Sequence, residues 1–271
     1  MRHPLLSFDR VLAIAHRGGA GVRPENTLAA FDGAVAEDVD AFELDVRLSR
    51  DGEVVVIHDA TLERTTSAAG AVSACTAEAL ARVDAAWHFG PDRGFPFRGQ
   101  GIGIPRLSEV LRRYADVPVV VELKGDSVEL AHRTVEVIRQ ANAIDRVVVA
   151  GFAAATMAAV RRCAREMTTS ACTPEVRRAL FGGYVGISAR RRAYQLLSVP
   201  ERRGMWRVIS RGFVRRAIGA GVPVHVWTVN EAEEMQRLIA WGVTGIISDR
   251  PSVAVAVARE SRPLASVPLQ R

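Results

Sequence analysis

The stretch VLAIAHRGG (residues 11–19), followed by PENTLAAFDGAVAE (24–37) and AFELDV (41–46), decides the fold. Its first part is an apolar run of the strand type, its second part has the length and spacing of a helix, and its third part is another apolar run. Parallel strands need a connection of this length, because a tight turn would reverse the chain direction. The stretch therefore predicts a strand–helix–strand unit within a parallel sheet.

The same alternation continues through the 271 residues and predicts an α/β fold, a closed (β/α)₈ TIM barrel. We expect one catalytic domain over residues 1–260, with a small insertion at about 60–105 after the second strand and a flexible tail at 261–271. The strands are expected at 11–15, 41–46, 117–123, 146–151, 167–173, 194–199, 222–226 and 245–248. The helices are expected at 27–37, 107–115, 127–141, 153–165, 175–181, 210–220, 231–241 and 252–260.

The cysteines and the hydropathy pattern indicate the compartment. Cys75, Cys163 and Cys172 are widely spaced and odd in number, which favours neither a disulfide framework nor a CxxC metal site. The N-terminus has no apolar signal region, and no later run reaches the length of a membrane span. We therefore expect a cytoplasmic protein without a transmembrane segment.

The net charge of +6 is concentrated between residues 161 and 216, where 14 arginines stand against three acids. Attraction to a lipid or nucleic-acid surface is one interpretation. Solvated helix faces are the favoured one, because no aromatic interleaving or nucleic-acid motif accompanies the charge. We expect no nucleic-acid partner and at most weak peripheral contact with membranes, and the sequence leaves the oligomeric state open.

Polar residues stand where the predicted strands end, and catalytic groups of α/β barrels lie at the carboxyl ends of strands. Lys124 is a candidate site residue for a second reason, because it is the only lysine among 36 basic residues. We therefore expect this position to require the compact shape of an ammonium group. The polar strand ends are His16-Arg17, Glu43-x-Asp45, Glu122-x-Lys124, Trp227 and Asp249.

Glu43 and Asp45 are two residues apart on a strand and so point to the same face. With Glu122 from the third strand, they would place three negative charges in a poorly solvated barrel mouth, where a cation is needed to stabilise them. Carboxylate oxygens suit Mg²⁺ or Ca²⁺ better than Zn²⁺, so we expect one divalent cation at these residues. The alternative for any single acid is a helix cap or an arginine partner.

Two histidines follow strands in this region. A turn at 49–52 and a short strand at 53–57 predict a hairpin that returns His58 to the neighbourhood of Glu43 and Asp45. Together with His16 it would form a general acid/base pair. The other histidines, His3, His88, His132 and His225, are expected to be surface or core residues.

Arg17 and Lys124 add positive charge, which suits an anionic substrate such as a phosphodiester. Trp227 either fills the top of the barrel or contacts an apolar or polyol part of the substrate. Asn26 is expected to be the N-cap of the first helix.

These residues together resemble the glycerophosphodiester phosphodiesterase family. The resemblance rests on His16-Arg17-Gly18, Pro24-Glu25-Asn26-Thr27, Glu43-x-Asp45, His58-Asp59, Glu122-Leu123-Lys124, Val226-Trp227-Thr228-Val229-Asn230 and Ser248-Asp249-Arg250-Pro251.

The resemblance implies a TIM barrel that hydrolyses glycerophosphodiesters to sn-glycerol 3-phosphate and an alcohol. It implies a divalent cation on Glu43, Asp45 and Glu122, and phosphate contacts from Arg17 and Lys124. By the same similarity, His16 is expected to be the base that activates the glycerol 2-hydroxyl or a water. His58 is then expected to be the acid that protonates the departing alcohol.

Three other functions are compatible with part of this pattern. A lysophospholipase D-like enzyme at membrane surfaces would keep the fold and change the substrate. A non-catalytic glycerophosphodiester-binding barrel should have lost a histidine or a metal ligand, and this sequence has lost none. Iron or zinc held by His16, His58 and a carboxylate is disfavoured, because three carboxylates already form an oxygen-rich site.

Overall fold

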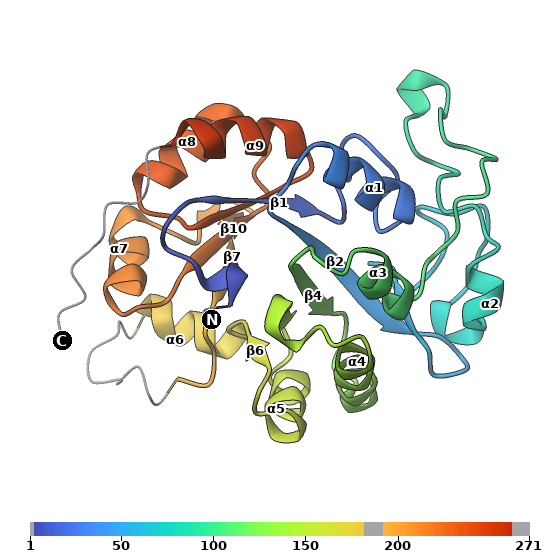
Figure 1. The fold of residues 1–271 in the computed structure, drawn as a ribbon, viewed down its shortest axis with the longest axis horizontal. Coiled ribbons are helices and arrows are strands. Elements are labelled where there is room, and N and C mark those ends of the chain that lie inside the picture. The colour runs from blue at the N-terminus through green and yellow to red at the C-terminus, as the bar shows by residue number, and fades with distance from the viewer. Residues whose placement is uncertain (1–2, 182–191, 262–271) are drawn as a thin grey trace.

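The computed structural model describes residues 3–181 and 192–261, which contain a (β/α)₈ barrel (Figure 1). Its strands are hydrogen-bonded in the order β6-β5-β4-β2-β1-β11-β10-β7. A parallel bridge between Ser170 and Leu196 closes the ring between β6 and β7. The eight parallel strands are β1 (Leu12–His16), β2 (Ala41–Leu48), β4 (Val119–Leu123), β5 (Val147–Gly151), β6 (Thr168–Thr169), β7 (Leu197–Pro200), β10 (Val224–Trp227) and β11 (Gly245–Ser248).

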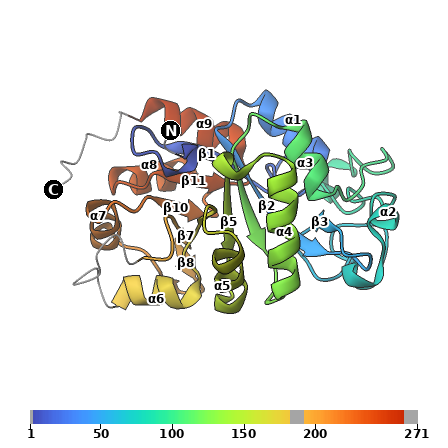
Figure 2. The same cartoon turned by 60° about the horizontal axis from the view of Figure 1, so that its bottom comes forward.

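The predicted helices all occur and surround the strands (Figures 1 and 2). Strands β6 and β7 are shorter than the ranges expected for them, 167–173 and 194–199. Near the bridge that closes the barrel, both segments form only an isolated pair in place of a regular ladder. The barrel helices are α1 (Leu28–Ala36), α3 (Leu107–Arg113), α4 (Val128–Gln140), α5 (Ala154–Cys163), α6 (Thr173–Phe181), α7 (Arg211–Gly219), α8 (Ala232–Ala240) and α9 (Pro251–Glu260).

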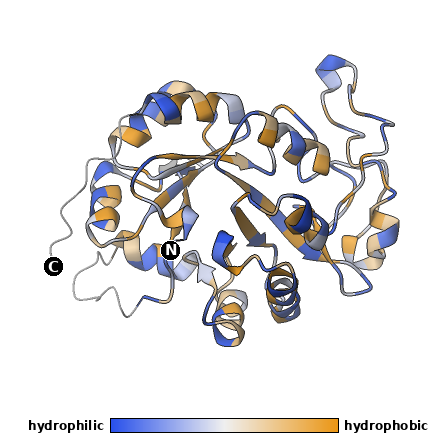
Figure 3. Ribbon diagram, in the orientation of Figure 1, coloured by the Kyte–Doolittle hydropathy of each residue, from blue (hydrophilic) through white to orange (hydrophobic). Residues whose placement is uncertain are grey.

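Buried hydrophobic residues form clusters inside the barrel and between its strands and helices. The strands are coloured mainly as hydrophobic in Figure 3. The barrel interior contains Ile14, Val120 and Ile247. The short 3₁₀ helix η1 (Pro4–Leu6) adds Leu5 to this interior cluster, and its side chain is 1% exposed. Because residues from η1 and several strands fill the interior, the barrel is a packed core.

The predicted hairpin after β2 is confirmed. Strand β3 (Val54–Val56) pairs antiparallel with β2, and Gly52 takes the positive φ of 76° in the turn. The segment between β3 and α3 lies beside β3, at the side of the barrel (Figures 1 and 2). It packs on Val55 and Ile57 through its own small cluster, which includes Leu62 and Leu80. It contains η2 (Val72–Ala74), α2 (Ala77–Leu80) and η3 (Pro91–Arg93).

Three smaller elements complete the described chain: the 3₁₀ helix η4 (Ile144–Arg146) and a hairpin of β8 (Arg202–Arg203) and β9 (Trp206–Arg207). Within residues 3–181 and 192–261, no helix has both the length and the apolar character needed to cross a membrane. The tail expected at 261–271 lies, beyond Ser261, outside the described residues.

Candidate active site

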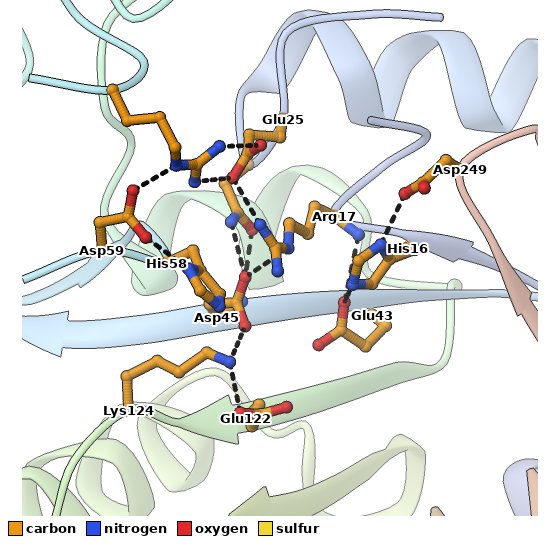
Figure 4. Close-up of polar contacts among 12 residues, drawn as sticks. His16, Arg17, Glu25, Glu43, Asp45, His58, Asp59, Glu122, Lys124 and Asp249 are labelled. Atoms are coloured by element: carbon orange, nitrogen blue, oxygen red, sulfur yellow. Dashed lines mark hydrogen bonds and ion pairs between the residues drawn. The ribbon is translucent and has the colours of Figure 1, made fainter. Parts of the chain in front are cut away.

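A cavity of about 220 Å³ opens at the carboxyl ends of the strands. Its lining includes every predicted site residue except Asp45, whose side chain is 1% exposed. Parallel strands put their carboxyl ends at one side of a barrel, so residues from the start and the middle of the chain meet here. The lining residues with functional groups are His16, Arg17, Glu43, His58, Glu122, Lys124 and Trp227. Figure 4 labels all of these except Trp227.

The three carboxylates converge as expected. Asp45 of β2 and Glu122 of β4 are register partners on neighbouring strands, and Glu43 lies two residues before Asp45. One oxygen of each can be chosen so that all three lie within 4.8 Å of one another. Such a spacing allows three oxygens to coordinate one ion.

The pKa values of these carboxylates indicate whether the site suits a cation. Burial, with the charge of Asp45 added, raises the pKa of Glu43 to about 8. Burial likewise raises the pKa of Glu122, although Lys124 opposes it. Asp45 Oδ1 is buried without a hydrogen bond of good geometry to any described residue, although the Lys124 Nζ atom lies 2.9 Å away. The raised pKa values of Glu43 and Glu122 mean that the nearby cations do not fully offset the negative charge there, which fits a divalent cation.

His16 is held by a carboxylate behind it. Its Nδ1 atom lies 2.6 Å from Asp249 Oδ1, and its Nε2 atom lies 3.8 Å from Glu43 Oε2. Burial would lower the pKa of His16, but the hydrogen bond with Asp249 and the charge of Glu43 outweigh it, so the pKa is raised. A cation held by Glu43 would offset that charge and lower the pKa of His16 again.

His58 has the same arrangement with its neighbour in the chain, Asp59. The distance from His58 Nδ1 to Asp59 Oδ1 is 2.6 Å. Burial lowers the pKa of His58 despite the opposing charge of Asp45 and the hydrogen bond to Asp59. In both histidines the carboxylate fixes the ring through Nδ1, which leaves Nε2 as the atom available for proton transfer.

The two cations expected to contact phosphate contact carboxylates in the structure. The Arg17 guanidinium lies 2.8 Å from Glu25 Oε1 through Nη1 and 3.1 Å from Asp45 Oδ2 through Nε. Lys124 bridges Asp45 and Glu122. These contacts keep both cations at the cavity wall, where positive charge would meet an anionic ligand.

The loop after β1 is tightly packed. Gly18 has a φ of +82°, and a Cβ at this position would lie 2.8 Å from the Ala30 Cβ of α1. Arg17 also has a positive φ, 51°, and its backbone N–H donates to Glu43 Oε2 over 3.1 Å. The glycine therefore lets the loop approach α1 closely, and the backbone of Arg17 supplies a hydrogen bond to a candidate metal ligand.

Known proteins with similar sequences identify the family of this chain. The model of the Glycerophosphoryl diester phosphodiesterase family matches residues 16–253. The chain belongs to this family. It is 32% identical to a glycerophosphodiester phosphodiesterase of Caldanaerobacter subterraneus over 93% of this chain and 99% of that one.

Two solved structures show the same fold. The glycerophosphodiester phosphodiesterase of Agrobacterium tumefaciens superposes with a TM-score of 0.74 at 25% identity, over 93% of this chain and 100% of that one. A phosphodiesterase of Oleispira antarctica, solved in complex with the product sn-glycerol-3-phosphate, gives 0.73 at 24% identity, over 93% and 98%. Membership of the family makes the chain an enzyme, a hydrolase of phosphoric diesters that acts on glycerophosphodiesters.

One expectation about this enzyme was wrong: Asn26 is not the cap of α1. Thr27 is the N-cap and accepts a hydrogen bond from the Ala30 N–H. Asn26 has a φ of 58°, and its amide instead donates to Asp45 Oδ2 over 2.9 Å and accepts from the Asp45 N–H over 3.3 Å. Both residue types cap helices well, so the sequence did not distinguish them.

Four further residues lie at the site although the sequence alone did not predict a role for them. Asp249 and Asp59 orient the two histidines, and both stand at strand ends, which was the available signal. Phe152 lies edge-on to Trp227, with ring centroids 5.9 Å apart, and it follows β5 directly. Arg64, from the segment after β3, contacts both Glu25 and Asp59. No motif in that segment indicated such a contact.

Proposed function

We propose that the enzyme hydrolyses glycerophosphodiesters to sn-glycerol 3-phosphate and an alcohol, with one divalent cation at Glu43, Asp45 and Glu122. The observation that carries the proposal is the convergence of these oxygens within 4.8 Å, beside two histidines that are each fixed by a carboxylate. The all-oxygen donor set suits Mg²⁺ or Ca²⁺. The product complex of the Oleispira antarctica phosphodiesterase, a barrel of the same fold, supports the choice of product.

The proposed division of labour follows from the geometry. When bound, the cation would stabilise negative charge on the phosphoryl oxygens. Lys124 and Arg17 would add hydrogen-bond donors for the same oxygens. His16 would take a proton from the glycerol 2-hydroxyl or a water through Nε2, and His58 would give a proton to the departing alcohol. Trp227 would form an apolar wall against the substrate.

The proposal is tested by the release of glycerol 3-phosphate from glycerophosphocholine, measured with the purified protein before and after chelation. We expect EDTA to abolish the rate and added Mg²⁺ or Ca²⁺ to restore it. Glu122→Gln should weaken binding of the ion, measured directly by calorimetry, whereas Glu78→Gln in an exposed ion pair should not. A rate that chelation leaves unchanged would refute the metal site. The cytoplasmic location and the weak membrane contact stay predictions.

A further inference from the structure

A second and larger cavity, of about 540 Å³, adjoins the catalytic one. It lies between the carboxyl ends of β5, β6 and β7 and helix α6. The candidate metal ligand Glu122 and the aromatic pair Phe152 and Trp227 belong to the walls of both cavities. A diester whose phosphorus lies at the carboxylates can therefore extend one of its two alcohols into the second cavity.

The size of the second cavity indicates a large alcohol. The catalytic cavity has about 220 Å³, so the second cavity more than doubles the space that borders Glu122. Choline and ethanolamine have few heavy atoms and would fill only a part of it. Cavities of this size bind ligands as large as a substituted ring. The space therefore suits a cyclic alcohol.

Three hydroxyl groups in the wall of the second cavity are free to bind a ligand. They belong to Ser170, which follows β6, to Thr173, the first residue of α6, and to Ser198 in β7. Within residues 3–181 and 192–261, none of these three side-chain oxygens takes part in a hydrogen bond. A hydroxyl can both donate and accept, so these groups match the hydroxyls of a polyol.

The apolar part of the wall fits the other surface of such a ring. Phe152 and Trp227, with ring centroids 5.9 Å apart, lie in this wall together with Val176 and Val199. A cyclic polyol carries C–H groups on its faces and hydroxyls around its edge. A mostly apolar wall with a few placed polar groups can therefore bind both parts of it.

Two arginines add positive charge to the same cavity. Arg177 of α6 and Arg202 of β8 line it, both are exposed, and neither pairs with an acid among the described residues. Arg161 and Arg237, in the same half of the chain, are by contrast each paired with a glutamate. Free guanidinium groups bind phosphate through parallel hydrogen bonds and repel an amine or a quaternary ammonium.

From this geometry we infer that the preferred substrates are glycerophosphodiesters whose departing alcohol is a cyclic polyol with a phosphate of its own. The inference rests on the proposed function, since the same catalytic groups cleave the diester. Water is consumed: its oxygen ends on phosphorus, the bond between phosphorus and the polyol oxygen breaks, and that oxygen takes a proton. The products are sn-glycerol 3-phosphate and the polyol phosphate.

The first test compares glycerophosphoinositol with its 3-, 4- and 5-monophosphates, and glycerophosphocholine is the reference substrate. At least one monophosphate should have a kcat/KM about five-fold or more above that of glycerophosphoinositol, because its second phosphate can pair with two guanidinium groups. If no monophosphate exceeds glycerophosphoinositol while glycerophosphocholine is hydrolysed, the inference is overturned and the proposed function is intact. If no diester is hydrolysed, the proposed function fails as well.

The second test removes the two positive charges. The double variant Arg177→Gln, Arg202→Gln should lower the ratio of kcat/KM for the best monophosphate to kcat/KM for glycerophosphoinositol at least about five-fold. Arg178→Gln is the matched control, because Arg178 is the next residue of α6, is exposed and does not line the cavity; it should keep the ratio. The two single variants replace the double variant if circular dichroism shows that the latter does not fold. Folded variants that keep the wild-type ratio overturn the inference.

A third test measures binding without catalysis. Inositol 4-phosphate is titrated by calorimetry in the presence of EDTA, so that no divalent cation contributes. The wild type should bind it at least about five-fold more tightly than the double variant does, and more tightly than it binds unphosphorylated inositol. Equal affinities in wild type and double variant would refute the role of the arginines. Inorganic phosphate that binds as tightly as inositol 4-phosphate would refute recognition of the polyol.

Discussion

Arg64 forms a bidentate ion pair with Glu25, with its Nη1 and Nη2 atoms 2.8 and 2.7 Å from the two carboxylate oxygens. Its Nε atom also donates to Asp59. Glu25 in turn binds Arg17, and Asp59 binds His58. Through Glu25 and Asp59, Arg64 thus connects Arg17, which is proposed to contact phosphate, with His58, which is proposed to give the proton.

This position makes Arg64 a candidate positioning residue. Arg64→Ala should lower kcat/KM for glycerophosphocholine roughly ten- to hundred-fold, the range typical when a residue that orients a ligand or catalytic group is removed. Arg64→Lys should recover little, because an ammonium cannot replace a planar group that spans two carboxylates.

The control for Arg64 is Arg82→Ala, in the same segment. Arg82 pairs with Glu78 on the surface, and both side chains are 71% exposed, so this change should leave kcat/KM within about two-fold. Full recovery of activity in Arg64→Lys would mean that charge alone, without the fork geometry, holds Glu25 and Asp59.

The roles of the two histidines can be separated with a leaving group that needs no proton. With glycerophospho-p-nitrophenol as substrate, His58→Ala should keep most of the wild-type rate, since the nitrophenolate departs unprotonated. His16→Ala should be inactive on both this substrate and glycerophosphocholine, because both reactions require the base. Release of nitrophenolate measures the rate on the nitrophenyl diester, and release of glycerol 3-phosphate measures the rate on glycerophosphocholine. The opposite pattern would exchange the roles of His16 and His58.

Lys124 lies between Asp45 and Glu122, with Nζ 2.9 Å from Asp45 Oδ1. Lys124→Arg should lower kcat/KM more than about ten-fold, because the larger planar guanidinium does not fit where the compact ammonium contacts both acids. The reverse exchange at the surface, Arg82→Lys, is the matched control. Unchanged activity in Lys124→Arg would make the single lysine of the sequence a coincidence.

The burial of His225 is expected to make the stability of the folded protein depend on pH. Its side chain is fully buried in β10, next to Gly245, where an added Cβ would lie 2.5 Å from the ring. Burial lowers the pKa of His225 from 6.5 to about 3. The unfolded chain therefore binds a proton below pH 6.5 that the folded chain does not bind until about pH 3. This group contributes its full stability above pH 6.5, and that contribution is lost as the pH falls.

Urea unfolding at pH 7 and pH 5 measures this effect. The loss of unfolding free energy between these values should be about 2 kcal/mol smaller in His225→Leu than in the wild type, at about 1.4 kcal/mol per pH unit below 6.5. His88→Leu, which changes an exposed histidine, is the control and should follow the wild type. Equal losses in wild type and His225→Leu would show that His225 is not the group responsible.

The sequence by itself determined the eight-fold alternation of strands and helices, because apolar periodicity and turn residues are local signals. It also identified the polar strand ends of β1, β2 and β4, since parallel strands in a barrel bring their carboxyl ends to one mouth whatever the details of packing. The common location of His16, Glu43, Glu122 and Lys124 followed from that rule alone.

Only the tertiary structure decided which partner each side chain meets. Asn26 and Thr27 are both residue types that cap helices well. Thr27 is the N-cap of α1, because the Asn26 side chain is hydrogen-bonded to Asp45, which lies close to the loop only in the folded chain. Arg64 reaches Glu25 across 39 residues of chain, through a segment with no periodic pattern. The second cavity exists because β5, β6, β7 and α6 leave space between side chains that are individually ordinary. Such contacts depend on three-dimensional packing, which no local pattern encodes.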